Sequence, residues 1–161
     1  MATTGCSTFN RDWKRESATP ATAHDIEGRW EGSWLSDRNG HHGRLRCLVN
    51  RLDDRSYRAR FKATYWKIFR FGYSVNLLVT REETGAFKFQ GESDLGWWGG
   101  GVYHYAGRAT PGDFGSTYRS KYDHGTFRMA RPDTIVPSPN HSGNGLPFVS
   151  GANQMRTIPS K

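Results

Sequence analysis

The chain has 161 residues and a formal net charge of +8 at neutral pH. That length predicts one domain with tails, since a domain typically takes about 100–200 residues. No stretch approaches the ~20 apolar residues of a membrane-spanning helix, which excludes a helical span. Residues 26–131 alone hold 18 Lys and Arg against 11 Asp and Glu, so the charge belongs to the folded part and favours anionic partners.

Residues 1–25 are rich in Thr, Ser, Ala and charged side chains, and they show no apolar period. Such a segment cannot bury enough apolar surface to offset the entropy lost on ordering. We therefore predict a mostly disordered leader or tether over 1–25. No segment of the chain shows a pattern that predicts a helix.

Residues 26–131 contain eight segments of alternating apolar and polar residues, separated by turn signals such as Asn39-Gly40. The clearest segment runs from Tyr57 to Tyr65, where rings and alanines alternate with Arg, Lys and Thr. Successive side chains of a strand point to opposite faces, so this pattern predicts one face on a core and one in water. The predicted strands span about 27–36, 43–51, 57–65, 69–81, 86–92, 101–109, 114–122 and 126–131.

The links between these strands are short, which favours an up-and-down meander, and closing the meander into a barrel removes its exposed edges. We therefore predict an all-β fold with a single antiparallel up-and-down barrel of about eight strands over 26–131. Residues 132–161 are rich in Pro, Ser, Asn and Gly and are predicted to form a mostly disordered tail. Both the N-terminal and the C-terminal tails are thus expected to be flexible.

The first predicted strand opens with Gly28-Arg29-Trp30. This resembles the Gly-x-Trp that begins the first strand of lipocalins and related calycin barrels, and avidin-type barrels open in a similar way. The resemblance implies a calycin-like barrel in which Trp30 closes one end and an arginine near the last strand, Arg128 or Arg131, packs across it. The chain lacks the Thr-Asp-Tyr and the disulfide of lipocalins.

Thr3-Thr4-Gly5-Cys6 resembles the end of a bacterial lipobox, whose cysteine is lipid-modified after cleavage. The family's usual Leu is replaced by Thr3, and no charged start or apolar stretch precedes the motif. The resemblance implies lipidation of Cys6 and a lipid anchor on the periplasmic side of a bacterial cell envelope, provided that the true start lies upstream. The alternative is a plain leader on a cytoplasmic protein.

The second cysteine, Cys47, alternates with Leu45 and Val49. This places Cys47 on the apolar face of a strand, where a free thiol acts as a small hydrophobe. A disulfide between Cys6 and Cys47 is the alternative.

The predicted inner face mixes large rings with Gly, Ala and Ser. An eight-stranded barrel is just wide enough to be filled by side chains or to hold one small ligand. Inward phenols need partners that a ligand or water would supply, whereas interlocking of large and small side chains would leave no cavity. Our first hypothesis is a non-enzymatic binding protein for a small amphipathic or hydrophobic ligand. The residues predicted to line its site are Trp30, Trp34, Tyr73, Tyr103, Tyr105 and Tyr118.

A second hypothesis is a structural or interaction protein whose basic outer face contacts anionic lipid or an envelope polymer. The residues predicted to form this face are Arg44, Arg46, Arg58, Arg60 and Lys62. The aromatic residues of the same strands point to the opposite face, which favours contact with phosphate over base stacking. Nucleic acid is therefore not expected as a partner.

Residues 95–101 form the most unusual segment, in which Trp97 and Trp98 are followed by three glycines. Adjacent side chains of an extended chain point to opposite sides, so at least one indole is expected at the rim or in solvent. We expect a capping loop whose Trp plugs the barrel end. A lid over the mouth and an anchor at a membrane interface are the alternatives.

The histidines show no metal-type spacing, so neither a metal site nor a cofactor is predicted. Asp123 precedes His124 in a predicted turn, but no nucleophile can be assigned to them, and no catalytic residue is predicted. A pocket that held His124 together with Asp94 or Glu92 would indicate an enzyme instead. Nothing in the pattern predicts an oligomeric state.

Overall fold

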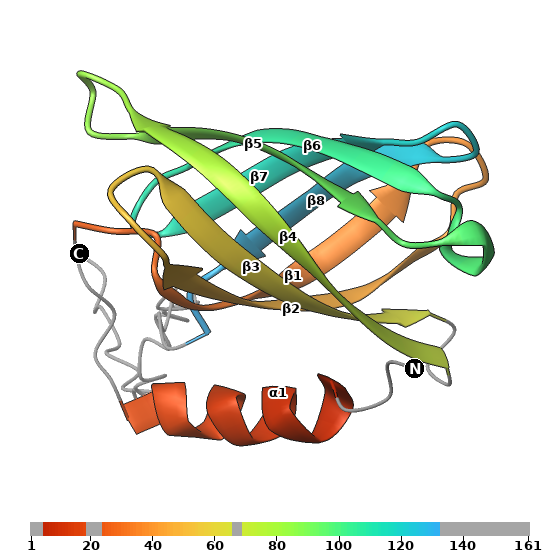
Figure 1. The fold of residues 1–161 in the computed structure, drawn as a ribbon, viewed down its shortest axis with the longest axis horizontal. Helices are drawn as coiled ribbons and strands as arrows, with labels where there is room; N and C mark the ends of the chain where they lie inside the picture. The colour runs from red at the N-terminus through yellow and green to blue at the C-terminus, as the bar shows by residue number, and fades with distance from the viewer. Residues whose placement is uncertain (1–4, 19–23, 66–68, 133–161) are drawn as a thin grey trace, which may run out of the picture.

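The computed structural model describes residues 5–18, 24–65 and 69–132 (Figure 1). Eight antiparallel strands form one closed barrel in which each strand pairs with the next and β8 returns to β1. The strands are β1 (Gly28–Ser36), β2 (His42–Arg51), β3 (Ser56–Tyr65), β4 (Phe69–Arg81), β5 (Phe87–Asp94), β6 (Val102–Ala109), β7 (Asp113–Arg119) and β8 (His124–Ala130). The predicted all-β, up-and-down barrel is confirmed.

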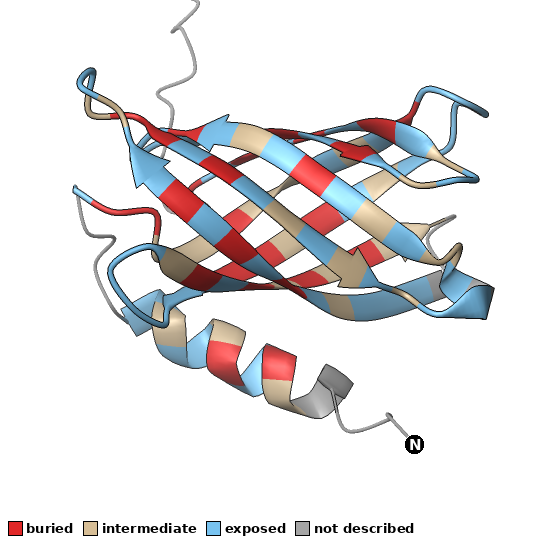
Figure 2. Ribbon diagram, turned by 45° about the horizontal axis from the view of Figure 1, so that its top comes forward, coloured by how far each residue is buried: buried red, intermediate tan, exposed pale blue. Residues whose placement is uncertain are grey.

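The core fills the barrel interior and is built mainly from rings. Buried and exposed residues alternate along the strands, as Figure 2 shows. The ring centroids of Phe89 and Phe114 lie 4.6 Å apart, and Phe114 and Trp30 lie 5.3 Å apart. Cys47 is fully buried and free in this core, and burial raises the pKa of its thiol. The expectation of a buried, unpaired Cys47 is therefore confirmed.

The two ends of the barrel differ. What we call the closed end is where β1 begins, and residues 24–27 cover it, with Ile26 fully buried. What we call the mouth is where β1 ends, and the links 37–41, 95–101 and 120–123 surround it. The two ends therefore have different surroundings: the segment 24–27 covers one, and three loops surround the other.

A helix that the sequence did not predict lies along the outside of the barrel. Helix α1 (Gly5–Arg15) and the 3-10 turn η1 (Glu16–Ala18) run below β2 and β3 in Figure 1. Asp12 of α1 forms an ion pair of 2.9 Å with Arg60 of β3, and Phe9 is buried. The prediction of a disordered leader without a helix is therefore wrong for residues 5–18.

The helix escaped prediction because its described part carries only two large apolar side chains, Phe9 and Trp13, whose rings stack at 5.8 Å. Most of its binding to the barrel is polar instead. Trp13 lies under the guanidinium groups of Arg29 and Arg46, at 5.4 Å and 5.1 Å from the ring centroid. Phe9 and Trp13 lie four residues apart, as on one face of a helix, but two large apolar residues in one short segment are a weak signal, and the polar contacts depend on the tertiary structure.

Three further predictions from the sequence concern Tyr122, Cys6 and the C-terminal tail. Strand β7 ends at Arg119, so Tyr122, which the predicted strand 114–122 included, lies in the following turn and is 55% exposed. Cys6 belongs to α1, but its side chain lies outside the described residues, as does the tail at 133–161. None of the described helical segments is long and apolar enough to cross a membrane.

Candidate functional site

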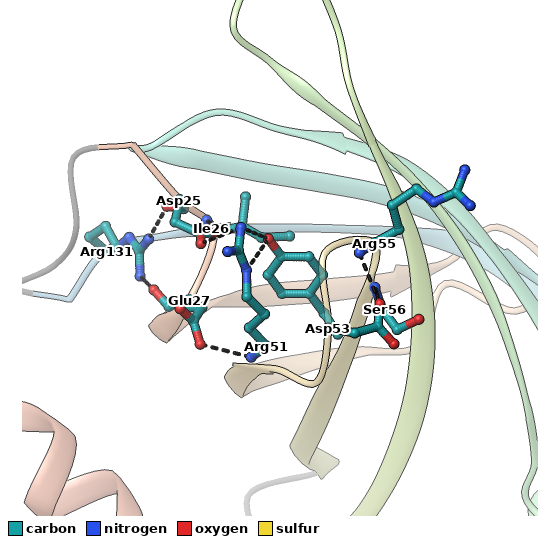
Figure 3. A network of polar contacts seen from close by, with 9 residues as sticks. Asp25, Ile26, Glu27, Arg51, Asp53, Arg55, Ser56 and Arg131 are labelled. Atoms are coloured by element: carbon teal, nitrogen blue, oxygen red, sulfur yellow. Dashed lines mark hydrogen bonds and ion pairs between the residues drawn. The ribbon is translucent and has the colours of Figure 1, made fainter.

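Arg131 crosses the closed end of the barrel directly after β8 (Figure 3). Its guanidinium carbon lies 3.9 Å from the ring centroid of Trp30. Its nitrogens donate hydrogen bonds to the backbone carbonyls of Asp25 (2.9 Å), Glu27 and Pro111 (3.1 Å). One side chain thus ties the start of β1, the link before β7 and the end of β8 together.

Of the two arginines that the calycin resemblance suggested, Arg131 occupies the position across Trp30, whereas Arg128 is exposed on β8. Burial lowers the pKa of Arg131 to about 10, and the nearby Asp25 carboxylate opposes that shift. The side chain therefore stays cationic at neutral pH. Gly28 leaves space for the Arg131 side chain, because a Cβ at position 28 would lie 3.0 Å from Arg131 Nη1. Its φ of +101° is a second reason for glycine here.

Trp30 belongs to this closed end and not to a ligand site. Its ring is fully buried, and its indole N–H donates to the Ile26 carbonyl at 2.8 Å. Arg51 reinforces the same end, since it donates to the Tyr57 hydroxyl at 2.9 and 3.0 Å and lies 3.3 Å from an Asp25 carboxylate oxygen. Every polar group in this cluster has a partner within the protein, so the closed end serves stability.

The mouth is different, because a cavity of about 120 Å³ lies inside it. It is partly open to solvent, and its wall is mostly apolar. The residues that line it are Trp34, Leu45, Ala63, Phe71, Tyr73, Leu95, Gly99, Tyr103, Tyr105, Tyr118, Asp123 and Phe127. The predicted site residues Trp34, Tyr73, Tyr103, Tyr105 and Tyr118 are thus brought together, and Trp30 is not among them.

Two polar residues of the cavity, Tyr118 and Asp123, lie where β7 turns into β8. The Tyr118 hydroxyl donates to the Leu35 carbonyl at 3.2 Å and lies 3.5 Å from Asp123 Oδ2. The other carboxylate oxygen of Asp123 accepts hydrogen bonds from Ser36 Oγ at 2.6 Å and from the His124 backbone N–H at 2.9 Å. Asp123 therefore places a carboxylate in a wall that is mostly apolar.

Trp34 contributes a buried indole nitrogen that has no hydrogen-bond partner among the described residues. The ring lies across Gly43 of β2, where a Cβ would come 2.9 Å from this nitrogen. Buried donors are paired in most native structures, so this nitrogen, packed against Gly43, is an exception in the barrel wall.

Burial raises the pKa of Tyr73, Tyr105 and Tyr118 in the cavity and of Tyr57 at the closed end. A phenol of this kind keeps its proton in the folded state at a pH where the unfolded chain has lost it. Its contribution to the free energy of unfolding is complete below about pH 10 and declines as the pH rises further. The barrel should therefore lose stability in alkali from about pH 10 upward.

Phenolate absorbance measured against pH tests this expectation. Of the seven tyrosines, these four should ionise only above the usual range, and their ionisation should coincide with loss of the near-ultraviolet circular dichroism of the fold. A single reversible step near pH 10 that included all seven tyrosines, with the fold intact, would contradict it.

The loop between β5 and β6 forms one side of the mouth. It contains the 3-10 turn η2 (Trp97–Gly99) and is closed by a hydrogen bond from Leu95 N–H to the Gly101 carbonyl at 3.0 Å. Gly100 has φ of +92°, and a Cβ there would lie 2.9 Å from the Tyr103 hydroxyl. Leu95 and Gly99 reach the cavity, so the loop helps to enclose it.

Trp97 does not plug the barrel, because it is 82% exposed. The expectation of an indole in solvent is thus confirmed, and the expectation of a plug is wrong for Trp97. The side chain of Trp98 lies outside the described residues.

The acidic residues and the histidine that would have indicated an enzyme do not meet in the described part of the cavity. Asp123 lines the cavity, but His124, Glu92 and Asp94 do not. Glu92 instead lies 3.6 Å from His104 on the outer face. Within the described residues, no group of three or more His, Cys, Asp or Glu is placed to hold a metal ion.

The basic residues of the outer face have different surroundings. Arg60 pairs with Asp12 under α1, and Arg58 lies on the exposed side of β3, 3.5 Å from the Asn76 side chain. Arg44 and Arg46 both pair with Glu31, and Lys62 donates to the Asn10 side chain at 2.8 Å. The five predicted residues therefore do not form one uniform surface.

Sequence reasoning missed several residues of the cavity, namely Leu45, Ala63, Phe71, Leu95, Gly99, Asp123 and Phe127. Most of them lie on predicted inward faces, but the sequence does not show which end of the barrel each one reaches. The fold is the closed eight-stranded barrel that a calycin-like architecture requires. Comparison with protein-family models, curated proteins and solved structures gave no match for this chain.

Proposed function

We propose that the protein is a calycin-like, non-enzymatic binding protein that holds a small amphipathic ligand in the mouth of its barrel. The observation that carries this proposal is the ring-lined cavity with one carboxylate in its wall. The placement of Arg131 across Trp30 supports the calycin-like part of it.

The volume of the cavity limits the ligand. About 120 Å³ is well below the roughly 300–1,000 Å³ of pockets that enclose a drug-sized molecule. It is close to the ~150 Å³ of an apolar cavity that accepts benzene in another protein. The cavity therefore suits a single ring, or one end of a longer molecule whose remainder leaves through the open mouth.

The chemistry of the wall limits the ligand further. The rings favour an apolar body, and their electron-rich faces also favour a cation. The Asp123 carboxylate adds a negative charge, and none of the lining residues that the structure describes is Lys or Arg. A ligand with an apolar body and a neutral donor or cationic head is therefore expected to bind better than one with an anionic head.

Three single-ring probes of similar size test this proposal: benzylamine, benzyl alcohol and benzoate. Binding is measured by titration with NMR observation of the Ala63 and Leu45 methyl groups. We expect benzylamine and benzyl alcohol to shift these signals and benzoate to bind at least roughly fivefold more weakly, because of the nearby carboxylate. In D123N, the preference for benzylamine over benzoate should disappear.

Filling the cavity provides the matched comparison. Ala63→Leu adds three carbons to the cavity wall and should abolish binding of benzyl alcohol, whereas Ala106→Leu adds the same group on the outer face of β6 and should leave it unchanged. Binding that survives Ala63→Leu, or that Ala106→Leu removes equally, would place the probe elsewhere and overturn the proposal.

A further inference from the structure

A second hollow lies on the outer wall of the barrel, beside α1. It has a volume of about 290 Å³ and a predominantly polar wall. Its lining comes from α1, β2, β3 and β4 and consists of Asn10, Arg44, Arg46, Lys62, Thr64 and Arg70. We call this hollow the basic groove. It shares no lining residue with the cavity at the mouth.

Strand register brings the cations of the basic groove together. Arg46 of β2 is the direct partner of Lys62 in β3, and Thr64 is the direct partner of Arg70 in β4. Opposed residues on one face of an antiparallel pair have Cβ atoms about 5 Å apart, and like charges in such positions repel. An anion between them would remove this repulsion.

The protein neutralises only part of this charge. Glu31 is the carboxylate beside the groove, and it pairs with both Arg44 and Arg46. Among the described residues, neither Lys62 nor Arg70 makes an ion pair, and Arg70 is exposed. Four cations therefore face one carboxylate, and the groove keeps an excess of positive charge.

Helix α1 orders the groove without neutralising it. The only described acid of α1 is Asp12, whose carboxylate is occupied by Arg60 and by Arg15 at 3.3 Å. Asn10 Oδ1 accepts a hydrogen bond from Lys62 Nζ at 2.8 Å, which holds the ammonium at the groove. The Asn10 amide hydrogens and the Thr64 hydroxyl are additional, neutral donors on the same wall.

This combination fits a tetrahedral oxyanion. Guanidinium groups offer paired donors that match phosphate geometry, and a lysine adds a point charge. We propose that the basic groove is a binding site for a phosphate or sulfate group, held by Arg44, Arg46, Lys62 and Arg70. The group belongs either to a small soluble ester or to a lipid head, and both present the same oxygens.

Calorimetric titration with inorganic phosphate and with glycerol 3-phosphate tests the site. The groove variant is Lys62→Gln with Arg70→Gln, and the matched control is Lys88→Gln with Arg119→Gln. The control residues are exposed basic residues of β5 and β7 outside the groove, so both variants lose the same charge. We expect at least about a tenfold loss of affinity in the groove variant and less than about a twofold loss in the control.

The single substitution Arg70→Gln tests the groove without removing a contact to α1. Among the described residues, Arg70 makes no ion pair with the helix, whereas Lys62 donates a hydrogen bond to Asn10. The single substitution should still weaken phosphate binding by several fold. Equal losses in groove and control variants, or no saturable binding to the unaltered protein, would overturn the proposal.

Vesicles separate the two sources of the phosphate group. Vesicles of phosphatidylcholine are compared with vesicles that also contain phosphatidic acid. Sedimentation with the second kind only, abolished by glycerol 3-phosphate and by Arg70→Gln, assigns the site to a lipid head. Saturable binding of glycerol 3-phosphate without sedimentation assigns it to a soluble ester. Ala63→Leu should change neither result, so this proposal fails or succeeds separately from that for the cavity.

Discussion

Arg131→Ala should lower the free energy of unfolding by about 3 kcal/mol or more, which is a large part of the stability of a small domain. The substitution leaves the carbonyls of Asp25 and Glu27 without the donor that they have at the closed end. It also removes the cation over Trp30 and opens space above the ring. Urea unfolding followed by tryptophan fluorescence measures the change.

Arg128→Ala is the matched control, because it removes the same charge from an exposed position on β8. It should change the free energy of unfolding by less than about 0.5 kcal/mol. Arg131→Lys keeps the charge but loses the planar guanidinium group. Its change in the free energy of unfolding should therefore lie between those of Arg131→Ala and Arg128→Ala. Equal effects of Arg131→Ala and Arg128→Ala would show that the closed-end contacts contribute nothing to stability.

Gly32→Ala should destabilise the barrel by about 3 kcal/mol, although it adds a single methyl group. Gly32 lies in β1 between Leu45 of β2 and Met129 of β8. A Cβ at this position would lie 1.9 Å from the Arg128 carbonyl oxygen and 2.7 Å from the Met129 Cα. Both atoms belong to the backbone, so β1 and β8 would have to separate.

Gly115→Ala provides the comparison, because it makes the same change in β7, where a Cβ would meet no atom within 4 Å. It should be neutral or should stabilise by about 0.5 kcal/mol, since alanine reduces the freedom of the unfolded chain. Thermal unfolding of the two variants measures the difference. A similar midpoint for both would contradict the close approach of β1 and β8.

Much of the fold follows from alternation alone. Phe127 and Met129 point inward. The same period of two places Arg128 on the outer face and Arg131 on the inner face. The choice between the two arginines could therefore have been made from the sequence. Helix α1 was harder to predict, because only Phe9 and Trp13 mark its apolar face, and its ion pair between Asp12 and Arg60 joins residues 48 positions apart.

The sequence indicated which side chains point inward, but not at which end of the barrel each of them lies. Trp30 and Trp34 share one face of β1, yet Trp30 lies at the closed end and Trp34 at the mouth. A period of two gives the face of a side chain and not its height in the barrel, which depends on the register between strands. Asp123 lies in a predicted turn and accepts the His124 N–H there, but its place in the cavity wall comes only from the closed barrel.

The order of the strands also bears on how the chain reaches its fold. Every pairing joins neighbours in sequence except the one between β1 and β8, which needs closure of a loop of roughly 100 residues. Gly32 and Arg131 both act at this seam. If hairpins form first and the seam last, the two substitutions should speed unfolding and leave the folding rate almost unchanged. The seam would then set the lifetime of the native barrel, while the local hairpins set how fast it forms.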